Sequence, residues 1–95
     1  MDKKVHGVNE IYTDNYELTL RLDDIGKKSI NDENFLMECI DYSVGRGFSR
    51  FVGSGEDFLI FSKPDYFDPD DMLITDTNFK SRVNELKNNK YPGLK

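Results

Sequence analysis

The densest group of side chains that could take part in chemistry lies between residues 65 and 71. It combines four carboxylates, two aromatic rings and a proline, in the order Asp65, Tyr66, Phe67, Asp68, Pro69, Asp70 and Asp71. Carboxylates can bind a cation, but a calcium loop needs oxygen ligands at other spacings and a glycine at its sharp turn. We therefore expect neither a metal ion nor a cofactor here.

The same run has the composition of a protein-binding surface. Aromatic rings supply contact area at a low entropic cost, and carboxylates attract a partner with a basic surface. Acidic side chains can also take the place of nucleic-acid phosphates, because they offer Lys and Arg the same negative targets. The alternative is structural: the rings anchor the loop and the aspartates form its turns. The predicted partner-binding residues are Asp65, Tyr66, Phe67, Asp68, Asp70, Asp71, Glu56, Asp57, Glu38 and Asp41.

Charge is distributed unevenly along the chain, whose formal net charge is −5. Residues 63–76 contain five acidic residues and one basic residue, a net charge of −4. Residues 77–95 contain five basic residues and one acidic residue, a net charge of +4. The acidic stretch predicts attraction to a basic partner, whereas the basic tail either binds anions or complements the dipole of a terminal helix.

The chain offers little material for catalysis. Its one cysteine, Cys39, can form neither an internal disulfide nor a cysteine-based zinc site, and it falls on an apolar helical stripe where a thiol is inert. Its one histidine, His6, lies beside lysines in a polar segment. The glycine-rich stretches 45–47 and 53–55 lack the Lys-Ser/Thr pair of a phosphate loop, so a helix stop and a hairpin turn explain them better. We expect no enzymatic activity.

Composition also indicates where the protein works. No stretch approaches the roughly 20 apolar residues of a membrane span, and residues 1–10 lack the apolar core of a signal peptide. The single cysteine fits a reducing compartment, so we expect a cytoplasmic protein. The sequence contains no Ala and no Gln but is rich in Lys, Asn, Ile and Asp, a bias of AT-rich coding that favours a low-GC bacterium or its phage.

Hydrophobic periodicity predicts a hairpin at the start of the chain. Tyr16, Leu18, Leu20 and Leu22 alternate with polar residues, which is the period of a strand over residues 16–22 with one buried face. Residues 8–12 are a shorter candidate strand, joined to it by the turn-prone residues 13–15. A polar connection with a glycine and no apolar period follows, made by Asp23, Asp24, Gly26, Lys27, Lys28 and Ser29.

An amphipathic helix is predicted over residues 32–43. Asn31 or Asp32 can cap its start, and its apolar positions are Phe35, Leu36, Cys39 and Ile40. We expect Gly45 to end it in the left-handed conformation.

A second hairpin follows, with strands at 48–52 and 58–62 around a glycine-containing loop. The continuous apolar run 58–61 suits a central strand. Residues 72–75 form a possible fifth strand, and a last helix begins at Asp76 or Thr77 with Phe79, Val83 and Leu86 on one face. The order ββαββ(β)α predicts one α+β domain over 1–95: a small, mostly antiparallel sheet of four to five strands with two helices packed on it.

The functional hypothesis is a small acidic protein-binding module without enzymatic activity. Its sharpest form is a phage- or mobile-element-type inhibitor that blocks the basic nucleic-acid-binding site of a host enzyme, such as a restriction or CRISPR effector, by mimicking phosphates. One alternative is a nucleic-acid-binding or regulatory module that uses the basic C-terminal helix. Another is a self-assembling protein, in which strand 58–61 lies at a sheet edge and pairs across a homodimer.

Overall fold

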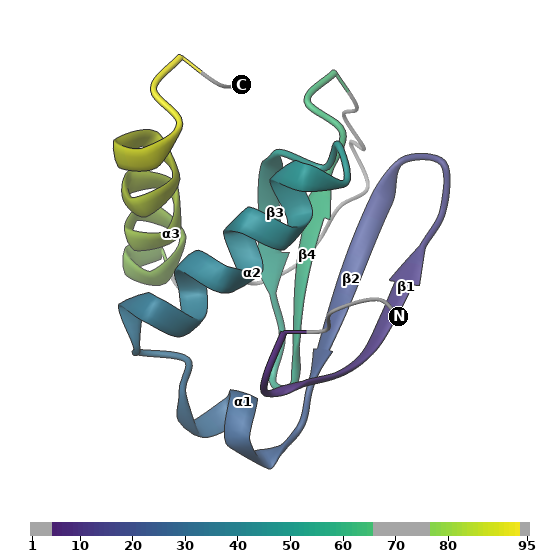
Figure 1. The fold of residues 1–95 in the computed structure, drawn as a ribbon, viewed down its shortest axis with the longest axis vertical. Coiled ribbons are helices and arrows are strands. Elements are labelled where there is room, and N and C mark those ends of the chain that lie inside the picture. The colour runs from purple at the N-terminus through teal and green to yellow at the C-terminus, as the bar shows by residue number, and fades with distance from the viewer. Residues whose placement is uncertain (1–4, 66–76, 94–95) are drawn as a thin grey trace.

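The computed structural model describes residues 5–65 and 77–93 of the chain. It confirms the α+β class: an antiparallel four-stranded sheet is combined with helices (Figure 1). The elements follow one another as β1 (Val8–Thr13), β2 (Glu17–Leu22), α1 (Asp24–Lys28), α2 (Glu33–Gly45), β3 (Arg50–Ser54), β4 (Phe58–Ser62) and α3 (Thr77–Lys90).

The strands lie in the order β1-β2-β4-β3, and each neighbouring pair is antiparallel. The apolar run of β4 occupies an inner position, as predicted for a central strand. Because both of its edges are paired, the edge position that self-assembly through this strand requires is not met. The possible fifth strand at 72–75 lies outside the described residues.

Alternation in β2 sorts its side chains between the two faces of the sheet. Leu18, Leu20 and Leu22 are buried on the face that α2 covers, while Arg21 is exposed on the other. Tyr16 does not continue this buried row as predicted, because it precedes β2 in the hairpin turn and is 53% exposed. The predicted alternation of buried and exposed side chains is therefore confirmed only within β2, which begins at Glu17.

One hydrophobic core lies between the sheet and the helices. Leu36 and Ile40 of α2 pack toward the leucines of β2 and the apolar residues of β4. α3 stands beside α2 at the β3 edge (Figure 1), where the ring of Phe79 meets Phe51 edge-on with centroids 5.9 Å apart. The buried apolar residues of this core are Val8, Leu18, Leu20, Leu22, Phe35, Leu36, Cys39, Ile40, Phe48, Phe51, Leu59, Phe61 and Val83.

The polar connection predicted over 23–29 contains a short helix instead, α1. Asp23 caps it, since its carboxylate accepts the N–H of Gly26 at 2.9 Å. Gly26 packs against the backbone of Gly7, which has a φ of +97°. The sequence did not indicate this helix, because a one-turn helix held by a cap and a backbone contact carries no apolar period.

Helix α2 begins as predicted and ends later. Asp32 is its N-cap and accepts the N–H of Asn34 at 2.9 Å. The helix continues through Gly45, and the left-handed residue is Gly47, with a φ of +91°, so the predicted stop at Gly45 is wrong. The N–H of Phe48 then donates to the Ser43 carbonyl at 2.9 Å, which turns the chain toward β3. β3 consequently starts at residue 50 rather than 48.

None of the helices that the structure describes is long and apolar enough to cross a membrane.

Candidate functional site

The structure describes five of the ten predicted partner-binding residues. The remaining five, Tyr66, Phe67, Asp68, Asp70 and Asp71, lie outside the described residues. The described five do not form one surface. Asp65 follows the end of β4, Glu56 and Asp57 form the turn at its beginning, and Glu38 and Asp41 project from α2.

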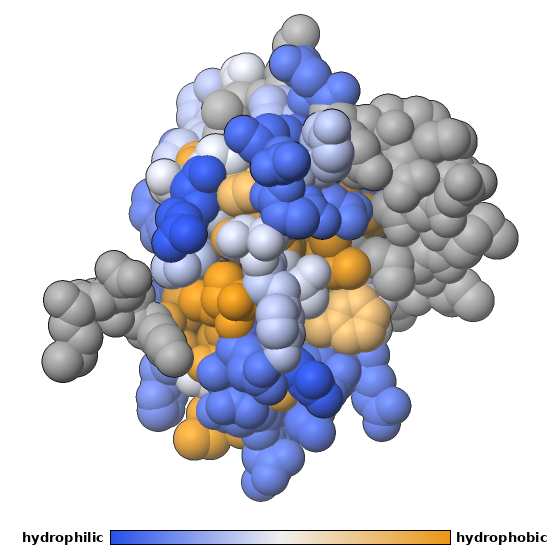
Figure 2. All heavy atoms as spheres, turned by 90° about the vertical axis from the view of Figure 1, so that its right-hand side faces the viewer, coloured by the Kyte–Doolittle hydropathy of each residue, from blue (hydrophilic) through white to orange (hydrophobic). Residues whose placement is uncertain are grey.

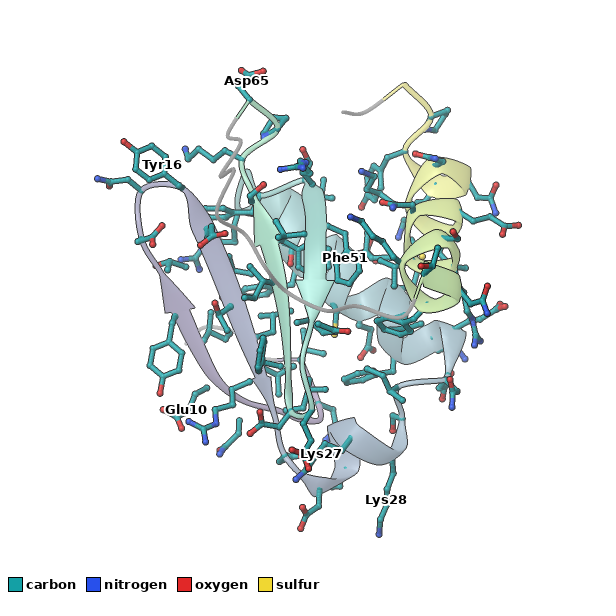
Figure 3. The ribbon with its side chains drawn as sticks, turned by 180° about the vertical axis from the view of Figure 1, so that it is seen from behind. Glu10, Tyr16, Lys27, Lys28, Phe51 and Asp65 are labelled. Atoms are coloured by element: carbon teal, nitrogen blue, oxygen red, sulfur yellow. The ribbon has the colours of Figure 1, made fainter. Side chains whose placement is uncertain are left out.

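Backbone contacts fix the two ends of β4 at opposite ends of the sheet. The N–H of Lys63 donates to the Tyr16 carbonyl at 2.9 Å, so Asp65 lies near the β1–β2 turn (Figure 3). The carbonyl of Asp57 accepts the N–H of Leu22 at 2.7 Å, near α1. The length of β4 separates these two groups of predicted site residues.

Two of the predicted acidic residues are engaged by the protein's own groups. The Asp57 carboxylate lies 3.5 Å from the Arg21 guanidinium. Asp41 accepts hydrogen bonds from Lys90 Nζ at 2.8 Å and from the Tyr91 hydroxyl at 2.6 Å. Partial burial alone would raise the pKa of Asp41, but these two hydrogen bonds outweigh it and lower the pKa below its ordinary value. Asp41 therefore acts as a tie between α2 and α3.

Three of the four basic residues of α3, Arg82, Lys87 and Lys90, contact other parts of the fold. Arg82 donates to the Asn31 carbonyl at 2.6 Å and lies 4.0 Å from the Glu33 carboxylate. Lys87 is buried and donates to the Ser49 carbonyl at 3.0 Å. Burial, with the nearby charge of Arg50, lowers the pKa of Lys87. These contacts help to hold α3 against α2 and the start of β3.

The catalytic candidates considered from the sequence do not assemble into a site. Cys39 is fully buried, and burial, aided by the charge of Glu38, raises the pKa of its thiol to about 12. His6 is exposed. Across residues 5–65 and 77–93, no three His, Cys, Asp or Glu side chains are grouped as metal ligands. The glycine-rich stretches 45–47 and 53–55 lie at the end of α2 and at the end of β3, as expected for a helix stop and a hairpin turn.

A different acidic and aromatic surface is present on the β1–β2 hairpin. It consists of Glu10, Tyr12, Asp14 and Tyr16, and we call it the hairpin surface. All four residues are exposed, and the two tyrosines, at 51% and 53%, are the most exposed large apolar side chains in the described part of the chain. Glu10 and Tyr12 lie opposite Arg21 and Thr19, on the sheet face turned away from α2.

Local hydrogen bonds set the charges of the hairpin surface. The Asp14 carboxylate accepts the N–H groups of Tyr16 and Glu17, both at 2.7 Å, and these bonds lower its pKa, so it stays ionised. The Tyr12 hydroxyl donates to the Glu10 carboxylate, which raises the pKa of Tyr12 and keeps its proton on. The surface therefore presents an ionised Asp14 and a protonated Tyr12 together with the exposed side chains of Glu10 and Tyr16.

Sequence reasoning missed this surface although a signal was present. Acid and aromatic residues alternate at every second position from 10 to 16. A period of two places such residues on one side of an extended chain. The signal was overlooked because Tyr16 fits the apolar alternation of the following strand equally well.

Comparison of the chain with protein-family models, curated proteins and solved structures finds no match. What the hairpin surface can do follows from its groups. Phenol rings offer flat apolar area with a hydroxyl at the rim, and carboxylates attract cationic side chains. Both carboxylates are exposed to water, which suits a surface that meets a partner better than proton transfer in a closed active site.

Proposed function

We propose that the chain is a protein-binding module without enzymatic activity, and that its hairpin surface docks on a basic surface of another protein. The observation that carries the proposal is that one hairpin carries two exposed tyrosines and two exposed carboxylates, with Glu10 beside Tyr12 on β1 and Asp14 near Tyr16 at the turn. Tyrosine is enriched at protein interfaces because it buries a large area while ordering few rotatable bonds. Carboxylates beside it steer the encounter with a cationic partner.

The charge balance within the fold favours this hairpin over Asp41 and Asp57. Asp41 and Asp57 already lie against cations of the same chain. Glu10 accepts the Tyr12 hydroxyl and lies opposite Arg21 in the ladder, whereas Asp14 accepts two backbone N–H groups. The Asp14 carboxylate, bonded to neutral groups, is therefore the charge of the hairpin that is best placed to attract an external cation.

A partner that normally binds nucleic acid is the class that fits best. Such a protein presents clustered Lys and Arg, and carboxylates can occupy positions that phosphates otherwise take. A net charge of −5 adds long-range attraction to a basic site. In this form the module inhibits an enzyme that processes nucleic acid, such as a restriction or CRISPR effector, by covering its binding site.

The test is capture of proteins from the lysate of the native host over a series of salt concentrations. We expect a captured protein whose retention falls as salt rises and which a short DNA duplex displaces. Tyr12→Ser with Tyr16→Ser, and separately Glu10→Gln with Asp14→Asn, should each lower capture about tenfold or more.

The matched control is Glu38→Gln with Glu56→Gln, which removes the same number of charges at exposed positions away from the hairpin. Circular dichroism establishes that each variant is folded. Equal losses in the control and hairpin variants, or capture that is indifferent to salt, would overturn the proposal. A shift of labelled DNA by the chain alone would favour the nucleic-acid-binding alternative instead.

A further inference from the structure

The two outer strands of the sheet differ in how their edges are covered. At the β3 edge, α3 packs against the sheet through Phe79 and Phe51, and Lys87 donates to the carbonyl of Ser49 just before the strand. At the other edge, β1 pairs with β2 alone among the residues that the structure describes. Within residues 5–65 and 77–93, no strand pairs with the other long side of β1.

The alternation of hydrogen bonds shows which groups of β1 face this side. The N–H of Asp14 donates to a carbonyl of β2 at 3.0 Å, which closes the hairpin. Hydrogen-bonded and non-hydrogen-bonded pairs alternate along an antiparallel ladder, so the pair Tyr12–Thr19 is the next one bonded. The N–H and C=O groups of Ile11 and Thr13 therefore point away from β2, toward the open side.

The side chains of β1 provide little protection against pairing. Natural proteins guard an edge strand with lysines, prolines, bulges or inward-pointing charges; β1, VNEIYT, contains no lysine or proline, and its irregularity is confined to its start, between Val8 and Glu10. On the β1 side of the molecule, apolar side chains reach the surface between bands of hydrophilic ones (Figure 2). Of β1 itself, Ile11 is half-buried and Tyr12 is 51% exposed.

We propose that β1 pairs antiparallel with β1 of a second copy of this chain, joining two four-stranded sheets into one. The pair is related by a twofold axis, so the strand must be complementary to itself. Successive residues of a strand point to opposite faces of the sheet, whereas residues directly opposite each other lie on the same face. The twofold axis must therefore pass through a residue position, where that residue lies opposite its own copy, and not between two positions.

Charge distinguishes the three registers that are centred on Glu10, Ile11 and Tyr12, in the middle of β1. An axis at Glu10 places the two copies of this carboxylate opposite each other. An axis at Tyr12 places Glu10 opposite Asp14 of the second copy, twice. An axis at Ile11 places Glu10 opposite Tyr12 of the second copy, and the outward backbone groups of the two Ile11 residues face each other. Like charges directly opposite are destabilising, so the Ile11 register is favoured.

The register also uses a contact that the single chain already makes. The Tyr12 hydroxyl donates to Glu10 of its own strand, on the sheet face turned away from α2. In the dimer, Glu10 of each copy lies opposite Tyr12 of the other copy on that same face. The short paired segment predicts a dimer that forms only at high protein concentration.

Sedimentation of the purified chain over about a hundredfold range of concentration tests the association. We expect a monomer at the low end and a dimer at the high end. Tyr12→Glu places like charges opposite each other twice and should raise the dissociation constant about tenfold. Tyr12→Lys places opposite charges there and should lower it.

Ser81→Glu and Ser81→Lys are the matched controls, because they make the same changes of net charge at an exposed position of α3. A chain that stays monomeric throughout, or variants that differ no more than the controls do, would overturn the proposal. If both Tyr12 variants weaken the dimer, the axis lies at Tyr12 and the proposed register is wrong.

Disulfide formation between two variants tests the register directly. Opposed residues of a non-hydrogen-bonded pair have Cα atoms about 4.5 Å apart, which a disulfide can bridge. Mixing Glu10→Cys with Tyr12→Cys should therefore give the mixed disulfide on mild oxidation. Each variant alone should give little, since its cysteines lie about 7 to 8 Å apart.

Cys39 does not interfere in this measurement because it is buried. Self-linked Tyr12→Cys as the main product, or no more linkage than Ser81→Cys gives, would contradict the pairing. Both measurements use the chain alone, so they give an answer independently of whether the hairpin surface binds another protein.

Discussion

At the scale of single residues, tight backbone packing restricts the choice of residue where α1 meets the segment before β1. A Cβ on Gly26 would lie 2.2 Å from the Gly7 carbonyl oxygen, which is a backbone atom that cannot rotate aside. Gly7 itself has a φ of +97°, a conformation that other residues rarely adopt. A neighbouring bond, from the Asp23 N–H to the Gly7 carbonyl at 3.0 Å, ties the same two segments.

Gly26→Ala should therefore lower the free energy of unfolding by about 1 to 3 kcal/mol, through overpacking. The matched control is Gly45→Ala, because a Cβ there meets no atom within 4 Å and the residue lies in the last turn of α2. The control should stabilise the fold by up to about 1 kcal/mol, since Ala is the better helix former. Urea unfolding measures both, and equal effects would contradict the contact.

At the scale of the elements, α3 is positioned by polar contacts with distant parts of the chain as well as by its apolar face. Its carboxyl-terminal end is tied to α2 through Asp41, Lys90 and Tyr91. Its apolar face contributes Val83, which is 1% exposed, to the core. The position of α3 against α2 therefore depends on contacts between residues that lie about half the chain apart in sequence.

Asp41→Asn should weaken this docking at neutral pH. The carboxylate is 38% exposed, so solvent screening limits the loss to about 0.5 to 1 kcal/mol. Folding lowers the pKa of Asp41, so its contribution is complete above the ordinary carboxyl value of about 3.9 and is lost as the pH falls through the folded-state pKa.

The measurement is urea unfolding of both proteins at neutral and acidic pH. The difference between wild type and Asp41→Asn should shrink in acid, where the wild-type carboxyl is protonated too. Glu38→Gln, an exposed change on the same helix, should show no comparable difference at either pH. A deficit of Asp41→Asn that persists unchanged in acid would contradict the ion pair.

At the scale of the whole molecule, stability depends on one core shared by the sheet and by α2 and α3. The core contains residues from every strand and from both long helices. A chain of 95 residues has a limited apolar area to bury, so each fully buried side chain is a large part of its net stability. Removing one central side chain should therefore lower the free energy of unfolding of the whole domain.

Leu36→Ala should lower the free energy of unfolding by about 2 to 5 kcal/mol, because Leu36 is 1% exposed and its removal leaves a cavity. Ile25→Ala, at a helical position that is 49% exposed, should change it by about 0.5 kcal/mol or less. Thermal unfolding followed by circular dichroism compares the two. A similar loss in both would show that Leu36 is not central to the core.

Much of the fold was predictable because its signals are local. Alternation along Leu18 and Leu20 identified β2, and the apolar run from residue 58 identified β4 and its inner position. The capping residue Asp32 located the start of α2. Helix α1 was missed because the Gly7 backbone that packs against it is distant in sequence and leaves no apolar period.

The sequence by itself determined the class of fold and most of the buried faces of its strands and helices. Only the tertiary structure decided which charges are paired within the fold. Asp41 looked like a free acidic residue until the fold brought Lys90 beside it, and Tyr16 looked buried until the hairpin turned it outward. The reason is physical: hydrophobic periodicity is a property of neighbouring residues, whereas charge neutralisation and exposure depend on which distant segments meet.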